Sequence, residues 1–281
     1  MIQDIAPHTY QNRYVHIRPQ EQDRVLIYRN KRVLLRTEPD ISYSAPIFAN
    51  LPEADKAHCM HKATYLFEID GEKYFLASNV DVQEGNHLFW FEMAHTRELQ
   101  PRHVAFLVIT GAQLNRWYET RAYCGRCGTP TEHSTTERAM VCPKCGNTEY
   151  PKICPAVIVC IRNGDKCVAS HYTDSRGKAH YSLIAGFAEI GETLEETVHR
   201  EVMEEVGLKV KNLTYYKSQP WSFSDTLLSG FYCDLDGDDT LRIDHNELKE
   251  AFWISRNELP CRENDISLTA EMMENFRKGL Y

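Results

Sequence analysis

Short apolar runs separated by turn residues dominate the first part of the chain and predict a β-rich beginning. The runs have the length and composition of strands, and they are Val25–Tyr28, Val33–Leu35, Thr64–Ile69 and Lys73–Leu76. Asp70-Gly71 separates the last two runs and is a strong signal for a two-residue hairpin turn. From Arg97 to Trp117 the apolar spacing becomes helical. We therefore expect a mixed α/β domain over residues 1–118, in which no catalytic chemistry is recognisable.

The pattern after Pro155 also combines strands with helices. Strands are expected at Ala156–Ile161, Lys166–Ser170, Thr214–Tyr216, Leu227–Cys233 and Glu250–Ile254. Helices are expected at Leu194–Val206 and Leu268–Lys278. Strands arranged around one strong internal helix predict a compact mixed α/β domain in this part of the chain.

Composition and charge narrow the class of protein. The chain has 281 residues, 42% hydrophobic and 26% charged, which excludes a mostly disordered or collagenous chain. No run of about 18 apolar residues is present, and Met1–Ile5 does not begin a signal peptide, so we expect a cytoplasmic protein without membrane contact. The net charge of -8 argues against general coating of nucleic acid. The negative net charge does not exclude binding of a small anionic ligand, provided that a metal ion supplies local positive charge.

The spacing of the cysteines indicates a metal-binding site. A reducing compartment disfavours structural disulfides among the ten cysteines. Two C-x-x-C pairs, 14 residues apart and flanked by glycines that favour tight turns, are formed by Cys124, Cys127, Cys142 and Cys145. Four thiolates close a tetrahedral shell around Zn²⁺, so this zinc is expected to be structural. Two redox dithiols are the alternative, but no thioredoxin-like context surrounds them. The other six are expected to be small buried residues: Cys59, Cys154, Cys160, Cys167, Cys233 and Cys261.

The helix expected at 194–206 carries clear start and stop signals and one apolar face. Thr193 with Glu196 resembles a capping box, and Gly207 is a plausible stop. At about 100° per residue, one apolar stripe contains Leu194, Val198, Val202 and Val206.

Three glutamates crowd this helix. Glu201 and Glu205 fall on or beside the apolar stripe, and Glu204 lies at its edge. Acids three and four residues apart repel each other, and carboxylates against an apolar face lose hydration. A divalent cation that bridges them removes both costs, and hard oxygen ligands favour Mg²⁺ or Mn²⁺. The alternative is a solvated acidic face neutralised by Arg200.

Residues 186–208 resemble the Nudix box. The pattern G-x5-E-x7-R-E-U-x-E-E-x-G-U, in which U is aliphatic, is matched at every fixed position by Gly186, Glu192, Arg200, Glu201, Val202, Glu204, Glu205, Gly207 and Leu208. The resemblance implies a domain of the α+β class over residues 152–281, a Nudix α/β/α sandwich with a mixed sheet. It also implies hydrolysis of nucleoside diphosphates linked to another moiety, with metals held by the box helix.

A second motif narrows the resemblance. Residues 218–226 read S-Q-P-W-S-F-S-D-T, similar to the S-Q-P-W-P-F-P-x-S motif of the NADH pyrophosphatase (NudC) group. A four-cysteine zinc ribbon before the Nudix domain, here residues 119–151, belongs to the same group, as does a preceding N-terminal domain. Ser222 and Ser224 replace two prolines and Thr226 replaces a serine, departures that bear on substrate preference more than on reaction type.

The resemblance implies roles for individual residues. Catalytic Mg²⁺ or Mn²⁺ would be held by Glu201, Glu204, Glu205, Glu247 and the backbone carbonyl of Ala185. Glu205 and Glu247 are the leading candidates for the general base. Substrate contacts are implied for Glu137, Tyr150, Phe187, Ser218, Gln219, Pro220, Trp221, Ser222, Phe223, Ser224, Asp225, Thr226 and Thr269, the last standing where the family has alanine. In this group the counterpart of Tyr150 reaches the partner subunit's site, so a homodimer is implied.

Three functional hypotheses follow. The leading one is metal-dependent hydrolysis of NAD(H) to NMN(H) and AMP, together with removal of the NAD cap from RNA 5′ ends to leave 5′-monophosphate RNA. A broad dinucleotide or ADP-ribose pyrophosphatase is the second, and the nicotinamide-group motif argues against it. The third is a catalytically dead nucleotide-sensing regulator, which the complete set of box glutamates and the lack of a basic stripe disfavour. Whether NADH, NAD⁺ or capped RNA is the physiological substrate stays open.

Overall fold

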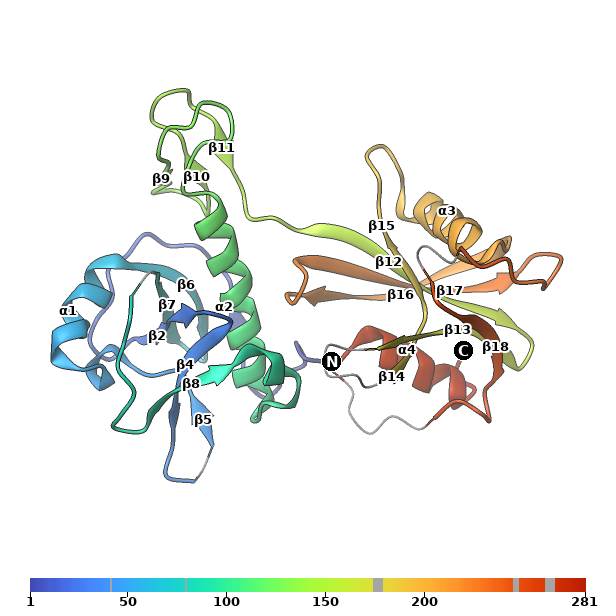
Figure 1. Ribbon diagram of the computed structural model, residues 1–281, viewed down its shortest axis with the longest axis horizontal. Coiled ribbons are helices and arrows are strands. Elements are labelled where there is room, and N and C mark those ends of the chain that lie inside the picture. Colours follow the sequence, from blue (N-terminus) through green and yellow to red (C-terminus); the bar gives the residue numbers. More distant parts are fainter. Residues whose placement is uncertain (41, 79, 174–178, 245–247, 261–265) are drawn as a thin grey trace. The chain divides into compact units, whose positions relative to one another are not determined.

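The computed structural model describes residues 1–281 apart from 41, 79, 174–178, 245–247 and 261–265. The chain forms two compact units (Figure 1). The N-terminal unit comprises residues 2–152 and 222–224, and the C-terminal unit comprises Met1, residues 153–221 and residues 225–281. The division into three domains stays a prediction. Within the described residues, no helix has the length and apolar composition needed to cross a membrane.

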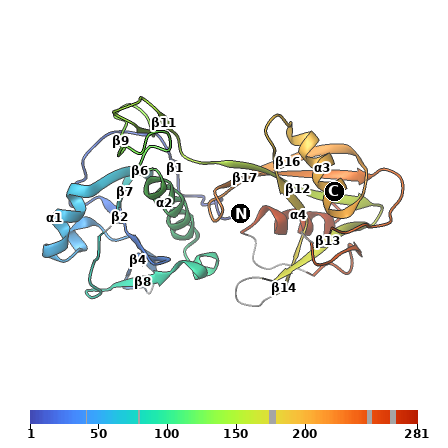
Figure 2. The same ribbon diagram turned by 45° about the horizontal axis from the view of Figure 1, so that its top comes forward.

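The described residues of the N-terminal unit form three small sheets and two α-helices (Figures 1 and 2). Two four-stranded sheets have the orders β1-β6-β7-β2 and β3-β4-β5, the latter with β8 beside β4, and the cysteine-rich segment forms β11-β10-β9. The strands are β1 Tyr10–Gln11, β2 Arg24–Leu26, β3 Tyr28–Arg29, β4 Arg32–Thr37, β5 Tyr43–Ser44, β6 Ala63–Ile69, β7 Glu72–Ala77, β8 Leu88–Glu92, β9 Glu132–His133, β10 Met140–Val141 and β11 Thr148–Glu149. The helices are α1 Glu53–Lys62 and α2 Arg102–Thr120, with 3₁₀ turns η1 Phe48–Asn50 and η2 Met93–Glu98.

Asp70 and Gly71 form the predicted hairpin turn. Their φ angles are 54° and 81°, in the left-handed region that a type I′ turn requires at both central residues. Ile69 pairs with Glu72 across the turn, which sets the register of β6 against β7. The prediction of a two-residue hairpin here is confirmed.

The helices of this unit differ from the sequence prediction. Helical structure was expected from Arg97, but α2 begins at Arg102 because Pro101 occupies the position just before the helix. A proline disfavours the α conformation of the residue before it and is well tolerated at a helix start. Helix α1 was not predicted, since it buries only Cys59 and therefore shows no apolar stripe.

The C-terminal unit is built on one seven-stranded mixed sheet. Its order is β14-β13-β12-β17-β16, with β15 pairing β12 and β18 pairing β13. β12 and β17 run parallel, whereas the other pairs are antiparallel. The elements are β12 Cys154–Asn163, β13 Lys166–Thr173, β14 Ala179–Ser182, β15 Ile184–Phe187, α3 Leu194–Val206, β16 Val210–Trp221, β17 Thr226–Leu235, β18 Ala251–Ser255 and α4 Leu268–Arg277.

Helices α3 and α4 cover opposite faces of this sheet (Figure 1). Successive side chains of a strand point to opposite faces, and the central strand β12 serves both cores. Val157, Val159 and Ile161 pack with α3, while Ile158 and Cys160 pack with α4. The predicted α/β/α sandwich with a mixed sheet is confirmed.

Helix α3 spans the predicted residues. The Glu196 N–H donates to Thr193 Oγ1 at 3.2 Å, and the Thr193 N–H donates to Glu196 Oε2 at 2.8 Å, which completes the capping box. Gly207 ends the helix with a φ of 69°. Val198, Val202 and Val206 are fully buried against the sheet, so the face of α3 that carries the box is fixed at both ends and along its length.

Candidate active site and zinc site

Four cysteines converge in the ribbon of the N-terminal unit. Cys124 Sγ lies 3.6 Å from Cys145 Sγ, and Cys127 Sγ lies 3.5 Å from Cys142 Sγ and 3.6 Å from Cys145 Sγ. Zn–S bonds of about 2.3 Å in a tetrahedron place sulfurs about 3.8 Å apart, whereas a disulfide requires about 2.05 Å. All four Sγ atoms lie within 4.8 Å of one another. The shell fits zinc and does not fit disulfides.

Two matching turns present these thiols. The Gly128 N–H donates to Cys124 O at 2.9 Å, and the Gly146 N–H donates to Cys142 O at 3.0 Å. Both glycines have φ near 70°, a backbone conformation that side chains with a Cβ rarely adopt. The predicted tight turns are therefore confirmed. Outside the ribbon, Cys154 is half-buried, Cys261 lies outside the described residues, and the expected buried cysteines are Cys59, Cys160, Cys167 and Cys233.

The three box glutamates of α3 lie at different depths. Glu201 and Glu205 are only 7% and 6% exposed, whereas the side chain of Glu204 is 55% exposed. Burying a carboxylate is unfavourable unless it is paired or coordinates a metal. Helix α3 therefore places two carboxyl groups, those of Glu201 and Glu205, in an unfavourable buried position against the sheet. The third, that of Glu204, lies beside them at the surface.

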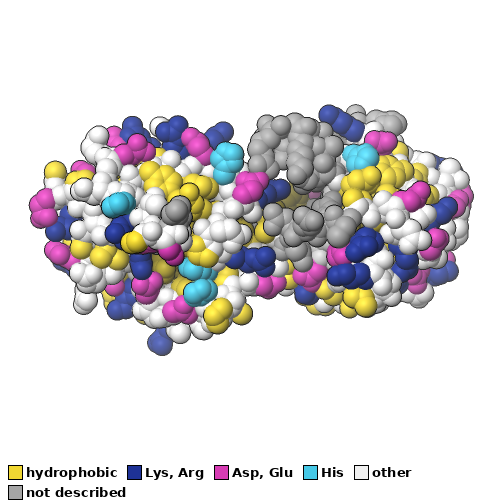
Figure 3. All heavy atoms as spheres, turned by 90° about the horizontal axis from the view of Figure 1, so that it is seen from below, with side chains coloured by type: hydrophobic (Ala, Val, Ile, Leu, Met, Phe, Trp, Pro, Cys, Tyr) yellow, Lys and Arg dark blue, Asp and Glu magenta, His cyan; other side chains and the backbone are white. Residues whose placement is uncertain are grey.

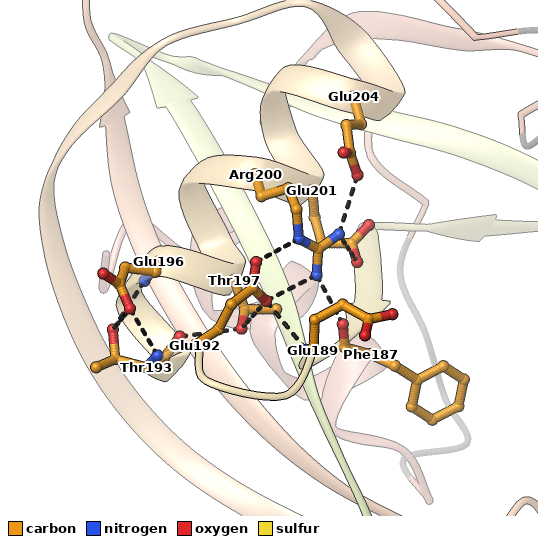
Figure 4. Close-up of polar contacts among 9 residues, drawn as sticks. All are labelled: Phe187, Glu189, Glu192, Thr193, Glu196, Thr197, Arg200, Glu201 and Glu204. Carbon is orange, nitrogen blue, oxygen red and sulfur yellow. Dashed lines mark hydrogen bonds and ion pairs between the residues drawn. The ribbon is translucent and has the colours of Figure 1, made fainter.

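Arg200 joins the acids of the box (Figure 4). Its Nε donates to Glu192 Oε1 at 2.6 Å, and its Nη1 donates to Glu201 Oε1 at 2.7 Å and to Glu204 Oε2 at 2.9 Å. The hydrogen bond from Arg200 lowers the pKa of Glu192 to about 2, and the same bond raises the pKa of Arg200. Because the folded-state pKa of Glu192 is depressed, this interaction stabilises the fold at neutral pH, and the stabilisation is lost progressively as the pH falls from the ordinary glutamate pKa of 4.5 to about 2.

Glu192 and Arg200 also fix the loop between β15 and α3. Glu192 Oε2 accepts hydrogen bonds from the Glu189 N–H and from Thr197 Oγ1, both at 3.0 Å. Arg200 Nη2 donates to Phe187 O at 2.8 Å. The ring of Phe187 points away from this network (Figure 4) and is 53% exposed. The loop is thus held at its start and its end, which leaves an aromatic face presented beside the acids.

Gly186 makes room for a box carboxylate. A Cβ at this position would lie 1.9–2.2 Å from the carboxyl atoms of Glu201. That distance is far inside van der Waals contact, so β15 and α3 approach each other as closely as Glu201 permits. The sequence marked Gly186, Glu192 and Arg200 as fixed positions of the box, but it did not reveal that they set the place of Glu201 and of the loop.

We expect Gly186→Ala to lower turnover by about 10²-fold, because a displacement of about 1 Å at a catalytic group has an effect of that size. The added methyl group would move the Glu201 carboxylate away from Arg200. Steady-state kinetics with NADH, the substrate class that the resemblance implies, measure the effect. Gly125→Ala is the control, because no atom lies within 4 Å of its added Cβ. Wild-type turnover in Gly186→Ala would show that the position of Glu201 is unimportant.

The S-Q-P-W segment is the end of a hairpin. Strand β16 runs to Trp221, β17 begins at Thr226, and these two residues pair. The predicted strand Thr214–Tyr216 was too short, because β16 begins at Val210 and extends to Trp221. Pro220 is accommodated because β16 is the last strand in the sheet order, where a missing N–H donor interrupts no ladder.

The predicted substrate residues of this hairpin differ in accessibility. Exposed side chains are Ser218, Pro220 and Ser224, half-buried ones are Trp221, Phe223 and Asp225, and buried ones are Gln219, Ser222 and Thr226. Gln219 Nε2 donates to Ile266 O at 2.9 Å, and its Oε1 accepts from the Leu268 N–H at 2.6 Å. Gln219 therefore fixes the start of α4, where Thr269 is half-buried. Contacts of these residues with substrate stay predictions.

Two predicted substrate residues of the ribbon contact each other. Tyr150 OH donates to Glu137 Oε1 at 3.2 Å, and Tyr150 is 57% exposed. The hydrogen bond raises the pKa of Tyr150, so the phenol stays neutral and keeps its proton. The sequence did not predict this pairing, because the two residues are 13 positions apart in a segment with little regular structure.

The predicted divalent-metal ligands are only partly described. Ala185 is exposed on β15 and pairs with Ile158, whereas Glu247 lies outside the described residues. Among the described residues, only the four cysteines bring three or more ligand atoms within 4.8 Å of one another. Arg200 instead lies between Glu201 and Glu204. The box still offers several hard oxygen donors against one guanidinium, a donor set that suits Mg²⁺ or Mn²⁺.

Comparisons with known proteins identify the family. The NUDIX domain model matches residues 152–276, and the NADH pyrophosphatase zinc ribbon domain model matches residues 120–150. The NAD-capped RNA hydrolase NudC of Citrobacter koseri is 39% identical over 216 residues, which are 76% of this chain and 80% of that protein. The NAD-capped RNA hydrolase NudC of Shigella dysenteriae serotype 1 is 40% identical over 71% of this chain and 74% of its own. The chain belongs to the NudC family of Nudix hydrolases.

Membership in the NudC family makes the chain a hydrolase, and the ribbon match confirms the predicted structural zinc. Among solved structures, a NUDIX hydrolase from Nitrosomonas europaea is 21% identical, covers 56% of this chain and 90% of its own, and has a TM-score of 0.47.

Proposed function

We propose that this NudC-family enzyme hydrolyses the pyrophosphate bond of NAD(H) to give NMN(H) and AMP, and removes the NAD cap from RNA 5′ ends to leave 5′-monophosphate RNA. The observation that carries the proposal is the intact box, in which Arg200 orders Glu192, Glu201 and Glu204 while Glu205 stays buried nearby. The relatives named NAD-capped RNA hydrolase support the choice of substrate.

The box residues supply the chemistry of the proposal. A pyrophosphate linkage is negatively charged and resists attack by water. A divalent cation, when bound, neutralises phosphoryl oxygens and lowers the pKa of water, and it would be held by Glu201, Glu204, Glu205, Glu247 and the carbonyl of Ala185. Glu205 or Glu247 takes a proton from the attacking water. Arg200, itself paired with Glu192, holds the Glu201 and Glu204 carboxylates in place before substrate arrives, which is the basis of electrostatic preorganisation.

Accessible aromatic side chains support the proposed preference of the enzyme for dinucleotides that carry aromatic rings. Phe187 and Tyr150 are exposed and Trp221 is half-buried. Stacking on such rings contributes about 1–3 kcal/mol per base. In the proposal these three side chains bind nicotinamide or adenine, and Tyr150 does so in the partner subunit's site of a homodimer.

The surface charge supports recognition of the cap more than of the RNA body. On the face drawn in Figure 3, Lys and Arg side chains are interspersed with Asp and Glu. The net charge of -8 points the same way, since affinity for an RNA backbone requires many cationic contacts. We therefore expect capped RNA binding to depend weakly on chain length.

One assay tests the proposal. The pure protein is incubated with Mg²⁺ or Mn²⁺ and, in parallel, with NADH, NAD⁺, ADP-ribose and NAD-capped RNA, and products are identified by mass. We expect NMN(H) from the nicotinamide compounds and 5′-monophosphate RNA from the capped RNA. Equal rates with ADP-ribose would support a broad pyrophosphatase instead. Binding without cleavage of any compound would support a nucleotide-sensing regulator.

A further inference from the structure

Arg138 of the ribbon is inserted among residues from β6 and from the segment that follows β1 in the N-terminal unit. Its Nη2 donates to Leu66 O, within β6, and to Asn12 Oδ1 at 3.1 Å. The guanidinium carbon lies 5.4 Å from the ring centroid of Tyr14. Its Nη1 is buried and has no hydrogen-bond partner among the described residues. A guanidinium is buried at a cost, so this arrangement indicates a specific attachment of the ribbon to the strands before it.

Tyr14 forms a second attachment to the ribbon, at Ser134, which lies four positions before Arg138. Its OH donates to Ser134 O at 2.8 Å, a contact between residues 120 positions apart. The Ser134 N–H in turn donates to Ala139 O at 2.9 Å, which closes the segment 134–139 into a compact loop. Both ends of this loop are therefore held by residues from the beginning of the chain.

Glu137 lies inside the loop that these contacts hold. Its N–H donates to Ser134 Oγ at 3.3 Å, and Arg138 follows it directly. Its carboxylate accepts the hydrogen bond from Tyr150 OH at 3.2 Å. The attached loop thus determines where the Glu137 carboxylate stands, and that carboxylate determines the orientation of the exposed Tyr150 ring.

We infer that Tyr14 and Arg138 are positioning residues, and that the region before the ribbon serves the enzyme by holding Glu137 and Tyr150 in the orientation used for binding the dinucleotide. This inference rests on the proposed function, in which Tyr150 binds the dinucleotide, and on the substrate contact that the family resemblance implies for Glu137. It assigns a role to the segment after β1 and to β6, in which the sequence shows no chemistry.

Tyr14→Phe tests the inference with the loss of one hydroxyl group. We expect KM for NADH to rise about three- to ten-fold, the effect of one hydrogen bond, while kcat and zinc content stay at wild-type values. Hydrogen exchange at the amides of residues 136 and 137 should accelerate, because their loop loses one attachment. Arg138→Lys, which keeps the charge but loses the forked geometry, should change KM in the same direction. Tyr43→Phe, elsewhere in the same unit, is the matched control.

A double-mutant comparison separates positioning from general destabilisation. In a Glu137→Ala background, Tyr14→Phe should raise KM no further, because the group it positions is gone. A wild-type enzyme that cleaves NADH, with KM and amide exchange unchanged in Tyr14→Phe, overturns the inference and leaves the proposed function intact. Equal effects of Tyr14→Phe in both backgrounds also overturn it. A wild-type protein that cleaves no nicotinamide dinucleotide overturns the proposed function itself, whatever the exchange rates show.

Discussion

Glu205→Gln is expected to lower the turnover of NADH by at least about 10²-fold, the contribution typical of a single acid–base group. Glu205 is 6% exposed in the last turn of α3, and the amide keeps its shape while it removes the negative charge. Because neighbouring glutamates on this helix repel one another, the metal-free variant should be at least as resistant to unfolding as the metal-free wild type. Steady-state kinetics and thermal unfolding without added metal measure the two effects.

The response to divalent ions gives a readout that does not depend on catalysis. A ligand at 100 times its Kd stabilises a folded protein by about 2.7 kcal/mol, so Mg²⁺ or Mn²⁺ should raise the Tm of the wild type more than that of Glu205→Gln. Glu195→Gln, at an exposed position in the first turn of the same helix, should behave as wild type in both assays. Full turnover in Glu205→Gln would exclude Glu205 as general base and as an essential ligand.

Cys142→Ser is expected to abolish zinc binding and to unfold the ribbon. Cys142 is 1% exposed, and its sulfur lies 3.5 Å from that of Cys127. Zinc binding contributes about 10–16 kcal/mol to the folding of small four-ligand modules, more than the remaining contacts of three two-residue strands provide. Zinc content and hydrogen exchange of residues 120–150 measure the loss.

The same variant should weaken NADH binding, because the proposed substrate contacts Glu137 and Tyr150 belong to the ribbon. Cys154→Ser is the matched control, since Cys154 is half-buried on β12 outside the zinc shell. Chelation of the wild type followed by addition of Mg²⁺ alone should leave the ribbon unfolded, which separates the structural metal from the catalytic one. A Cys142→Ser protein that retains one zinc per chain and an ordered ribbon would show that the cysteines are not the ligands.

Helix α3 was predictable to its last residue because independent signals agree there. The apolar stripe, the Thr193–Glu196 capping box and the left-handed Gly207 all define the same segment. The pattern of Glu201, Glu204 and Glu205 then located the candidate site. Helix α1 escaped prediction, since a helix that buries one side chain has no hydrophobic period.

The contacts that organise the site could not be predicted, because they join distant residues. Arg138 reaches Leu66 across 72 positions and Tyr14 reaches Ser134 across 120, and no local pattern encodes such a pairing. The fit of Gly186 against Glu201 likewise depends on how β15 packs beside α3. Family motifs name the residues of a site, whereas their mutual support becomes visible only in the fold.

Pro220 has a consequence for assembly. An unpaired border strand is a template on which a second molecule can continue the ladder, and β16 is such a border among the strands that the structure describes. A proline there withholds one donor from an incoming strand and interrupts any continuous ladder between two copies. If the enzyme works as a pair, its subunits should therefore join through side-chain surfaces, and that rim should stay open to solvent.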